Sequence, residues 1–497
     1  MKLNYDVYKD KVYACWLGKN IGGTIGMPYE GCREKLSLTG FTTPPKEPLP
    51  NDDLDLQLLW LHALQHEGAK SLTSEKLGEY WQTYVVQYWN EYGICKNNMK
   101  MGLYPQVAGE YKNPWKDSNG AWIRTEIWAT LSPACPDIAV RYAIEDAKVD
   151  HGFGEGTYAA AFVAALESAA FVISDVRELI SIGLSKIPED CRIAKTVNLV
   201  LNCFDEGKTA DETRDLIVDI NTDVGDGWFQ APSNLGYVIL GLLYGNGDFK
   251  KSLLFAVNCG DDTDCTAATI GSIMGLIYGT KSVPSDWVEY ISDKIVTLTI
   301  ARLFPIPKTC AELTEKIVNF VPAFLIENEA DVKIVDGESE IPEGILSKFK
   351  MPASINWGRT DEYCCAYYSN KNMCSFTVKA PTFTAIICYK DNPEIKANDE
   401  KEIYVRILNN VQAHGNIPRT VHIRVLDVSQ ELTVDKNDFF VNLPHFTTLS
   451  LEWISDYVPI VIKSGESVKA TNRILLEFYE EGRYTRVYAP IVFLGVY

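Results

Sequence analysis

The sequence lacks a hydrophobic run long enough to span a membrane. Its longest apolar stretch, residues 267–278, is too short and too rich in glycine for that role. The N-terminal segment reaches Asp10 and Lys11 without an apolar core or a small-residue cleavage site, which does not match a secretory signal peptide. We therefore expect a cytoplasmic protein with no membrane partner.

Basic residues are also scarce. The chain has 47 Lys and Arg against 66 Asp and Glu, which gives a formal net charge of −19 at pH 7. A surface of this sign repels nucleic acid, so we expect no nucleic-acid partner. A small anionic ligand is still compatible with this charge, because a bound divalent cation reverses the local sign of a site.

The 13 cysteines include no Cys-x-x-Cys pair, so neither a zinc ribbon nor a disulfide framework is indicated. The chain also has no internal repeat and no low-complexity tract. Its 497 residues are 46% hydrophobic and 23% charged, as in a globular protein. Since single cores stop growing at roughly 250–300 residues, this length predicts at least two domains.

The first part of the chain has the periodicity of helices. Apolar residues recur at three- and four-residue spacing in residues 54–64, 77–89, 137–148, 158–172, 191–202, 210–220, 234–244 and 265–278. Gly245 and Gly279 are expected to close the last two helices. We predict an all-helical domain over residues 1–330.

The period changes to two in the remaining part of the chain. Alternating, β-branched or aromatic residues occur in 375–378, 384–389, 402–408, 420–425, 459–463, 473–479 and 484–493. This pattern is typical of a β-sandwich or barrel. We predict a β-rich, sandwich-like domain over residues 331–497, with its boundary in the polar stretch 327–344.

An acidic motif opens the helix predicted at residue 54. Asn51, Asp52 and Asp53 are consecutive, and Asp55 follows two residues later. Side-chain oxygens gathered at a helix start suit a hard divalent cation, and the helix dipole favours carboxylates there. The alternative is simple N-capping, which needs only one of these residues.

A second acidic motif opens the helix predicted at residue 265. Asp261, Asp262 and Asp264 precede or begin a helix with so little side-chain bulk that its backbone must pack closely against neighbours. No group of Lys or Arg lies nearby in the sequence, so either distant bases or a metal must compensate these acids. We favour the metal.

The two acidic helix starts could meet at one binuclear centre. Helical isoprenoid synthases also hold magnesium with acid-rich helices, but residues 52–56 lack the acid that those enzymes carry at the fifth position. We therefore rank that alternative well below a binuclear centre.

Four motifs in a fixed order carry a resemblance to a known family. They are the Gly-rich segment 18–30 ending in Glu30, the Asn-Asp-Asp at 51–53, the Ser-Asn-Gly-Ala-Trp-Ile-Arg at 118–124, and the Gly-Asp-Asp-Thr-Asp-Cys at 260–265. In these motifs, over residues 12–280, the chain resembles the ADP-ribosylglycohydrolases, the family that includes dinitrogenase reductase activating glycohydrolase. The β-rich part lies outside the family's common core.

The resemblance implies a role for each matching residue. Two Mg²⁺ ions, with Mn²⁺ also compatible, would be held by Asn51, Asp52, Asp53, Asp262, Asp264 and Cys265. Asp53 or Glu30 would act as the general base. The substrate would lie against Asn119, Gly120, Ala121, Arg124 and His151.

Two residues depart from the family pattern, which usually has Thr at both positions. Asn51 supplies a carbonyl oxygen that suits magnesium. Cys265 is a softer ligand that suits zinc better.

Structural roles remain open for several of these residues. Glu30 could be a surface acid, His151 a packing residue, and Arg124 the ion-pair partner of Glu126 or Asp117. The tryptophans at positions 115, 122, 128 and 228 could stack on a base or fill the core.

The resemblance implies hydrolysis of an N- or O-glycosidic bond in an ADP-ribosyl or related ribosyl substrate, either a small molecule or an ADP-ribosylated protein. The alternative is a catalytically inactive relative that uses the same helical scaffold for binding or structure. The sequence predicts no oligomeric state and assigns no role to the β-rich domain.

Overall fold

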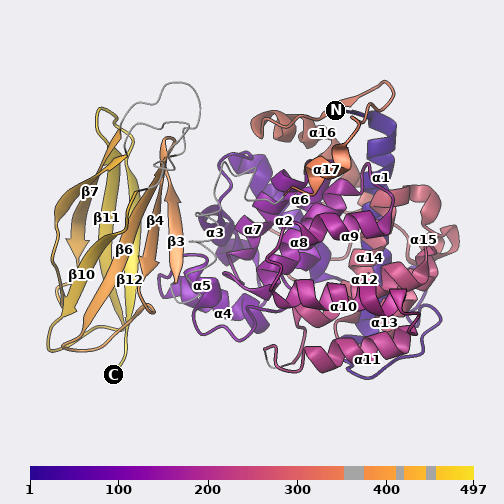
Figure 1. Ribbon diagram of the computed structural model, residues 1–497, viewed down its shortest axis with the longest axis horizontal. Coiled ribbons are helices and arrows are strands. Elements are labelled where there is room, and N and C mark those ends of the chain that lie inside the picture. The colour runs from indigo at the N-terminus through magenta and orange to yellow at the C-terminus, as the bar shows by residue number, and fades with distance from the viewer. Residues whose placement is uncertain (226, 352–373, 410–418, 444–454) are drawn as a thin grey trace. The chain divides into compact units, whose positions relative to one another are not determined.

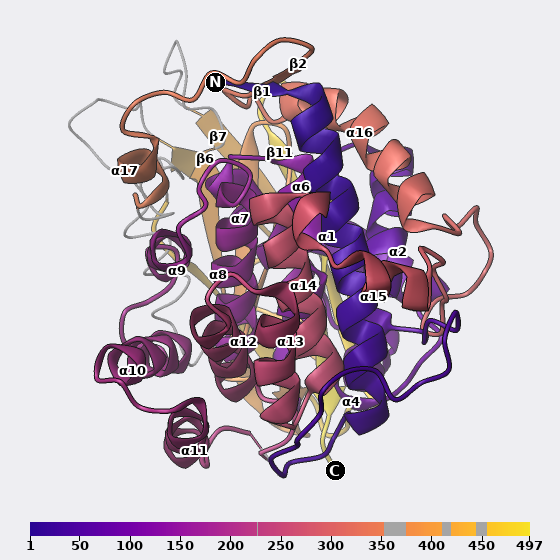
Figure 2. The ribbon, with the colours of Figure 1, turned by 90° about the vertical axis from the view of Figure 1, so that its right-hand side faces the viewer.

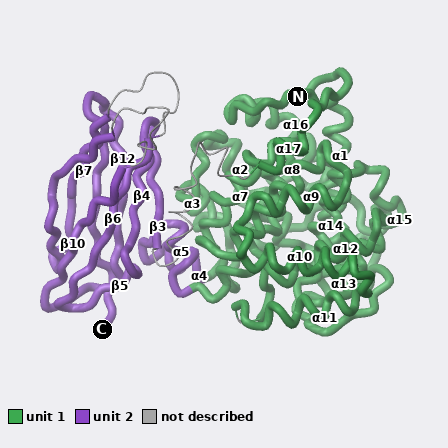
Figure 3. Tube along the Cα trace, in the orientation of Figure 1, with its two compact units in different colours: residues 1–93, 113–356 green, residues 94–112, 357–497 purple. Residues whose placement is uncertain are grey.

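The computed structural model describes residues 1–225, 227–351, 374–409, 419–443 and 455–497 (Figure 1). The chain divides into two compact units (Figure 3). The first combines Met1–Gly93 with Asn113–Asn356, and the second combines Ile94–Lys112 with Trp357–Tyr497. The division therefore does not fall at residue 330, and independent folding of residues 1–330 and 331–497 stays a prediction.

The first unit is built mainly from helices, as the periodicity predicts. Its helices are α1 (Tyr5–Gly26), α2 (Asp52–Glu67), α3 (Ser74–Tyr84), α6 (Glu126–Leu131), α7 (Pro136–Ala147), α8 (Glu155–Ala169), α9 (Val176–Leu184), α10 (Arg192–Asp205), α11 (Ala210–Ile220), α12 (Ala231–Gly245), α13 (Phe249–Asn258), α14 (Thr263–Tyr278), α15 (Ser285–Ile291), α16 (Cys310–Glu327) and α17 (Ile345–Phe349). It is not purely helical, because β1 (Lys2–Asn4) pairs in parallel with β2 (Lys333–Val335). Within the described part of the chain, no helix is long and apolar enough to cross a membrane.

All eight helices predicted from periodicity are present, with ends shifted by several residues in some cases. The expected helix over 77–89 is wrong at its end, because α3 stops at Tyr84. Val85 instead forms an extended bridge with Ile300. The predicted cap at Gly245 is also displaced by one residue, since Gly245 is still helical and Asn246 takes the left-handed conformation that ends α12.

Helix α1 packs directly against α14, with the two backbones in contact (Figure 2). A Cβ atom added to Gly18 would overlap the carbonyl of Gly271, and one added to Gly271 would overlap the carbonyl of Gly18. Near the end of α1, a Cβ on Gly26 would overlap the backbone of Thr263 and Asp264. The predicted close packing of the small-residue helix is therefore present, and it places the first turn of α14 beside the end of α1.

The second unit contains two five-stranded sheets. The first has the order β3 (Ser375–Lys379), β4 (Phe383–Tyr389), β6 (Glu400–Asn409), β10 (Val458–Ser464), β8 (Leu432–Val434). The second has the order β5 (Glu394–Ile395), β12 (Val487–Gly495), β11 (Thr471–Glu480), β7 (Arg419–Val428), β9 (Asp438–Leu443). The unit also includes α5 (Val107–Glu110) and most of α4 (Asn90–Lys100).

The two sheets confirm the β-rich C-terminal part. All seven predicted strands are present. Buried residues alternate along β6, as in Ile403, Val405 and Ile407, whereas all of β4 is buried. The short strands β5, β8 and β9 were not predicted.

The contact between α1 and α14 leads to a test with Gly271→Ala. Alanine normally stabilises a helix interior by about 1 kcal/mol relative to glycine. At Gly271 the added methyl group meets the backbone of Gly18, so we expect a net loss of about 1–3 kcal/mol in the free energy of unfolding. Denaturant unfolding monitored by circular dichroism measures this change.

The matched control is Gly40→Ala, since a Cβ at Gly40 would have no atom within 4 Å. Its unfolding curve should superimpose on that of the wild type. Equal behaviour of the two variants would show that α1 and α14 do not need their close contact.

Candidate functional site

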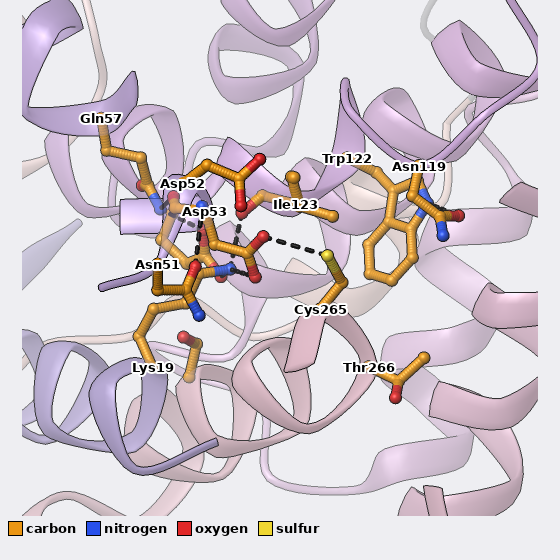
Figure 4. A network of polar contacts seen from close by, with 12 residues as sticks. Lys19, Asn51, Asp52, Asp53, Gln57, Asn119, Trp122, Ile123, Cys265 and Thr266 are labelled. Atoms are coloured by element: carbon orange, nitrogen blue, oxygen red, sulfur yellow. Dashed lines mark hydrogen bonds and ion pairs between the residues drawn. The ribbon is translucent and has the colours of Figure 1, made fainter. Parts of the chain in front are cut away.

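The two acidic motifs meet at one place in the helical unit. Helix α2 begins at Asp52 and α14 begins at Thr263. The Cys265 thiol donates a hydrogen bond of 3.1 Å to Oδ1 of Asp53 (Figure 4). Asp53, Asp264 and Cys265 each offer one ligand atom within 4.8 Å of the others, and all three are buried. The structure thus brings together side chains that lie more than 200 positions apart in the sequence.

The remaining predicted acids surround this group. The Asp52 carboxylate accepts a hydrogen bond of 2.9 Å from the hydroxyl of Tyr92, and that of Asp262 accepts one of 2.7 Å from the amide of Asn119. Glu30 follows the 3₁₀ turn η1 (Met27–Tyr29) and is exposed.

Burial of so many acids raises their proton affinity. Loss of hydration raises the pKa of Asp53 to about 7, and burial together with the neighbouring carboxylates raises the pKa values of Asp262 and Asp264 well above their usual range. Although Glu30 is exposed, partial removal of water and the nearby charge of Asp52 raise its pKa in the same direction.

Two oxygens in this cluster are suited to binding a cation. Oδ1 of Asp262 and Oδ1 of Asp264 are buried and accept no hydrogen bond from any described residue. Buried carboxylate oxygens need a hydrogen-bond donor or a cation. Hard oxygen ligands of this kind suit a divalent cation such as Mg²⁺.

One positive charge does reach the acids, and the sequence analysis missed it. Lys19 of α1 is fully buried, with Nζ 3.4 Å from Oδ2 of Asp53 (Figure 4). The same Nζ lies 2.7 Å from Oε1 of Glu126. Lys19 is thus a base distant in the sequence, but it reaches Asp53 of the first motif, whereas the choice of a metal over distant bases concerned the second motif and stays a prediction. Lys19 is the single charged residue between Lys11 and Glu30. A lone charge in this uncharged segment was the sequence signal that could have identified it.

Asn51 caps the start of α2, which was the structural alternative to metal binding. Its Oδ1 accepts a hydrogen bond of 2.7 Å from the backbone N–H of Asp53. Its amide nitrogen lies where a side chain on Gly23 would otherwise be, since a Cβ there would overlap it. Metal ligation by Asn51 stays a prediction.

The other two acids of the motifs, Asp55 and Asp261, accept hydrogen bonds from backbone N–H groups. The Asp55 carboxylate accepts hydrogen bonds of 2.6 Å from the N–H groups of both Leu298 and Thr299. Asp261 accepts one of 3.2 Å from the N–H of Phe229. These contacts fix the loops beside the two helix starts.

Arg124 is buried in an ion-pair network. Its Nε lies 2.9 Å from Oδ1 of Asp146, and its Nη2 lies 2.7 Å from Oδ1 of Asp150. The alternative partners Glu126 and Asp117 were wrong, whereas a structural ion pair is present. Arg124 also donates to the carbonyl of Gly120, so it holds the loop that was predicted to bind substrate. Direct contact between Arg124 and substrate stays a prediction.

His151 belongs to the same network and is fully buried. Its Nδ1 lies 2.9 Å from Oδ1 of Asp150, and its Nε2 lies 3.2 Å from the hydroxyl of Ser118. Burial alone would lower the pKa of His151, but the Asp150 carboxylate outweighs it and raises this pKa. Glu91 completes the group, and a Cβ on Gly120 would overlap its carboxylate.

Glu91, Asp150 and His151 also have ligand atoms within 4.8 Å of one another. A metal ion is disfavoured there, because the Arg124 guanidinium binds both oxygens of Asp150. The same guanidinium outweighs the effect of burial and holds the pKa of Asp150 at about 2. This second group is therefore a charge-balanced support for the loop 118–121, unlike the cluster around Asp264.

The tryptophans that could stack on a base are not equivalent. Trp122 and Trp128 are fully buried, and Trp115 is half-buried. Trp228 is 37% exposed.

Comparison with known proteins agrees with the family resemblance. The sequence model of the ADP-ribosylglycohydrolase family matches residues 4–315. Two curated relatives are both described as ADP-ribosylarginine hydrolase Tri1. The protein from Pseudomonas putida (strain GB-1) is 35% identical over 63 residues, and that from Serratia proteamaculans (strain 568) is 37% identical over 60 residues.

These two alignments are short. They cover 12% and 11% of this chain, and 17% and 16% of the respective relatives. A solved structure described as an ADP-ribosylglycohydrolase-related protein complex aligns with 64% of this chain and 98% of its own, at 17% identity and a TM-score of 0.44. Because the family model matches well over half of the 497 residues, the chain belongs to the ADP-ribosylglycohydrolase family.

Proposed function

We propose that the chain is a metal-dependent hydrolase that cleaves the glycosidic bond of an ADP-ribosyl group. The convergence of Asp53 and Asp264 in a buried cluster, with Asp262 interacting electrostatically with both, carries this proposal. Asp262 and Asp264 each have a buried oxygen that accepts no hydrogen bond from a described residue. Membership of the ADP-ribosylglycohydrolase family supports the same reaction class.

Two divalent cations, Mg²⁺ first and Mn²⁺ as the alternative, are proposed for this cluster. The proposed ligands are Asn51, Asp52, Asp53, Asp262, Asp264 and Cys265. When bound, the cations would hold ribose hydroxyls and increase the acidity of a water molecule.

Of the two candidate bases, Glu30 is the better placed. Asp53 is fully buried, and its carboxylate is already engaged by Lys19 and Cys265. Glu30 is exposed beside the same cluster, where substrate and water can reach it. We assign the base to Glu30 and a ligand role to Asp53.

In the proposed reaction, Glu30 takes a proton from water while the water oxygen attacks the anomeric carbon of ribose. The bond from that carbon to the leaving nitrogen or oxygen breaks, and the proton passes to the leaving group. Free ADP-ribose and an unmodified side chain result. ADP-ribose on arginine is the first substrate to test, because both curated relatives are described as ADP-ribosylarginine hydrolases.

The loop 118–121 is proposed to line the ribose side of the site. Asn119 links it to Asp262, and Arg124 fixes the carbonyl of Gly120 from behind. Ala121 and His151 complete the predicted set of substrate-binding residues.

Metal binding can be tested with Asp262→Asn and Asp264→Asn. Mg²⁺ or Mn²⁺ should raise the melting temperature of the wild type by mass action, and the rise should fall by more than half in each variant. Without metal, both variants should melt at or above the wild-type temperature, since each loses one of several crowded like charges.

Asp219→Asn is the control, because Asp219 is an exposed acid on α11. It should respond to metal as the wild type does. An equal rise in all four proteins would mean that the two motifs do not form a metal centre.

The base assignment predicts a large loss of activity in Glu30→Gln. Removal of a general base lowers the rate by about 10²- to 10⁴-fold. Release of ADP-ribose from an ADP-ribosylated arginine peptide measures this loss, and Glu34→Gln, an exposed acid four residues later, is the matched control. A binding protein without turnover would show no release in any variant, which would support the inactive alternative.

The raised pKa values predict an unusual pH dependence of the metal-free protein. Asp53, Asp55 and Glu91 each have a pKa of about 7 in the folded state, against roughly 4 in an unfolded chain. Between about pH 4 and about pH 7 the folded state therefore binds more protons than the unfolded chain. The free energy of unfolding is then highest at the low end of this window and falls as the pH rises to about 7.

Melting temperatures in chelator from about pH 5 to about pH 8 measure this trend. The decrease should be smaller in Asp264→Asn, because one contributing carboxyl is removed. A melting temperature that rises over this window would contradict the raised pKa values of these buried acids.

A further inference from the structure

One sheet of the second unit carries exposed aromatic side chains on its outer face. Phe440 of β9 is 61% exposed, and Tyr488 of β12 is 46% exposed. The neighbouring residues Val441 of β9 and Ala489 of β12 are buried. Because successive side chains of a strand point to opposite faces, Phe440 and Tyr488 lie on the face turned away from the core.

The strand register places an aromatic row across β9, β7 and β11. His422 of β7 lies opposite Phe440 of β9 on one side and opposite Tyr479 of β11 on the other. The rings of His422 and Tyr479 are stacked with centroids 4.9 Å apart, and the rings of His422 and Phe440 are 6.1 Å apart. The guanidinium of Arg486 lies 3.9 Å from the centroid of Tyr479. We call Phe440, His422, Tyr479 and Arg486 the aromatic row.

A charged row lies beside it, two residues away along each strand. Arg424 of β7 lies opposite Asp438 of β9 on one side and opposite Glu477 of β11 on the other. Tyr488 lies opposite Glu477 and donates a hydrogen bond of 3.4 Å to its Oε1. Glu477 is only 7% exposed, and its Oε2 accepts no hydrogen bond from any described residue. We call Asp438, Arg424, Glu477 and Tyr488 the charged row.

The far end of this face is covered by a segment of the same unit. A Cβ on Gly102 would lie 3.1 Å from Cγ2 of Val492 and 3.8 Å from Nη2 of Arg473, two residues that lie opposite each other on β12 and β11. Gly102 belongs to residues 94–112, which are part of the second unit. The charged row begins four residues away along both strands, at Glu477 and Tyr488. Rigid strands therefore present the two rows on the part of the face that this segment leaves open.

The composition of the two rows suits a neutral ligand with many hydroxyl groups. Their charges balance, with Arg424 and Arg486 against Asp438 and Glu477, whereas the whole chain carries a net charge of −19. This balance favours neither a polyanion nor a polycation. A purely apolar partner is also disfavoured, because it would take these charges out of water without replacing their partners.

A sugar polymer meets each of these requirements. Its hydroxyl groups both donate and accept hydrogen bonds, so they can pair with guanidinium, carboxylate and phenol groups together. The C–H groups of a sugar ring can pack on the electron-rich face of an aromatic ring.

We propose that the aromatic row and the charged row form a binding site for a neutral polysaccharide. Phe440 ends the aromatic row on β9, the last strand of its sheet in the described chain, and its outer ring face stacks on a sugar ring. The side chains of the charged row bind the hydroxyl groups of the same polymer. The site is formed by the second unit alone, so it does not depend on the proposed hydrolysis.

Affinity gel electrophoresis of the full-length protein tests this site. Native gels contain hydroxyethyl cellulose, a neutral β-linked glucan, soluble starch, a neutral α-linked glucan, or carboxymethyl cellulose, which has the β-linked backbone with added negative charge. We expect at least one of the two neutral polymers to retard the wild type, and carboxymethyl cellulose to retard it less. In Phe440→Ala the Kd for the neutral polymer should rise by about fivefold or more, since an aromatic contact contributes at this level.

Further variants separate the aromatic contact from a general effect on the surface. Phe440→Tyr should keep the retardation because it keeps the ring, whereas Phe440→Leu should lose it as the alanine variant does. Tyr488→Ala, on a different strand, should also weaken binding. The control is Tyr497→Ala, which removes an aromatic side chain that is 92% exposed beyond the other end of β12 and should bind as the wild type does.

Three results would overturn the proposal. The first is that neither neutral polymer retards the wild type, or that both retard it and the Phe440→Ala and Tyr488→Ala variants equally. The second is stronger retardation by carboxymethyl cellulose than by hydroxyethyl cellulose and starch, which would make this face an anion-binding surface. The third is self-association in analytical ultracentrifugation that Phe440→Ala abolishes, without retardation by either neutral polymer, which would make the face a contact between two copies of the chain.

Discussion

The close contact between α1 and α14 is the constraint on which the site depends. Side chains at Gly18 and Gly271 would overlap the facing backbone, so the two helices lie together without side chains between them. The same approach continues to Gly26, where the end of α1 meets the first turn of α14. Glu30 and Asp264 are neighbours for this reason, although they are distant in the sequence.

The second feature is that positive and negative charges are paired in the buried group around Arg124 but not in the buried group around Asp264. Around Arg124, the carboxylates of Asp146 and Asp150 are paired with a guanidinium, and the network is complete without a ligand. Around Asp264, the ion pair of Lys19 is with Asp53, and Lys19 shares its charge with Glu126. Like charges in a dry site are costly unless they are protonated or bound to a cation, so this cluster is the one suited to a metal.

Much of the fold was readable from the sequence, because amphipathic helices and alternating strands leave a periodic pattern. Helices α13 and α16 were not predicted from periodicity, and the second contains Pro322 in its interior. The short strands β8 and β9 were also missed. The periodic signal is weak when an element is short or carries an unusual residue.

The two acidic motifs were found because several ligand-type residues are adjacent in the sequence. Lys19 and Glu91 were missed because each acts alone, and its partners are distant in the chain. Arg124 was predicted to lie beside the loop 118–121, and it does. Its ion-pair partners were not predicted, because Asp146 lies in α7 and Asp150 follows that helix, away from the loop in the sequence. Ion pairs between distant elements depend on the tertiary fold, and a single sequence contains no local pattern for them.

The central claim is that the starts of α2 and α14 form one metal centre. An anomalous difference map from crystals grown with Mn²⁺ tests it most directly. The account predicts density between the carboxylates of Asp53, Asp262 and Asp264, with metal-to-oxygen distances of about 2.0–2.6 Å, the range of hard divalent cations. Absence of density there, or a peak beside Glu91 and His151 instead, would contradict it.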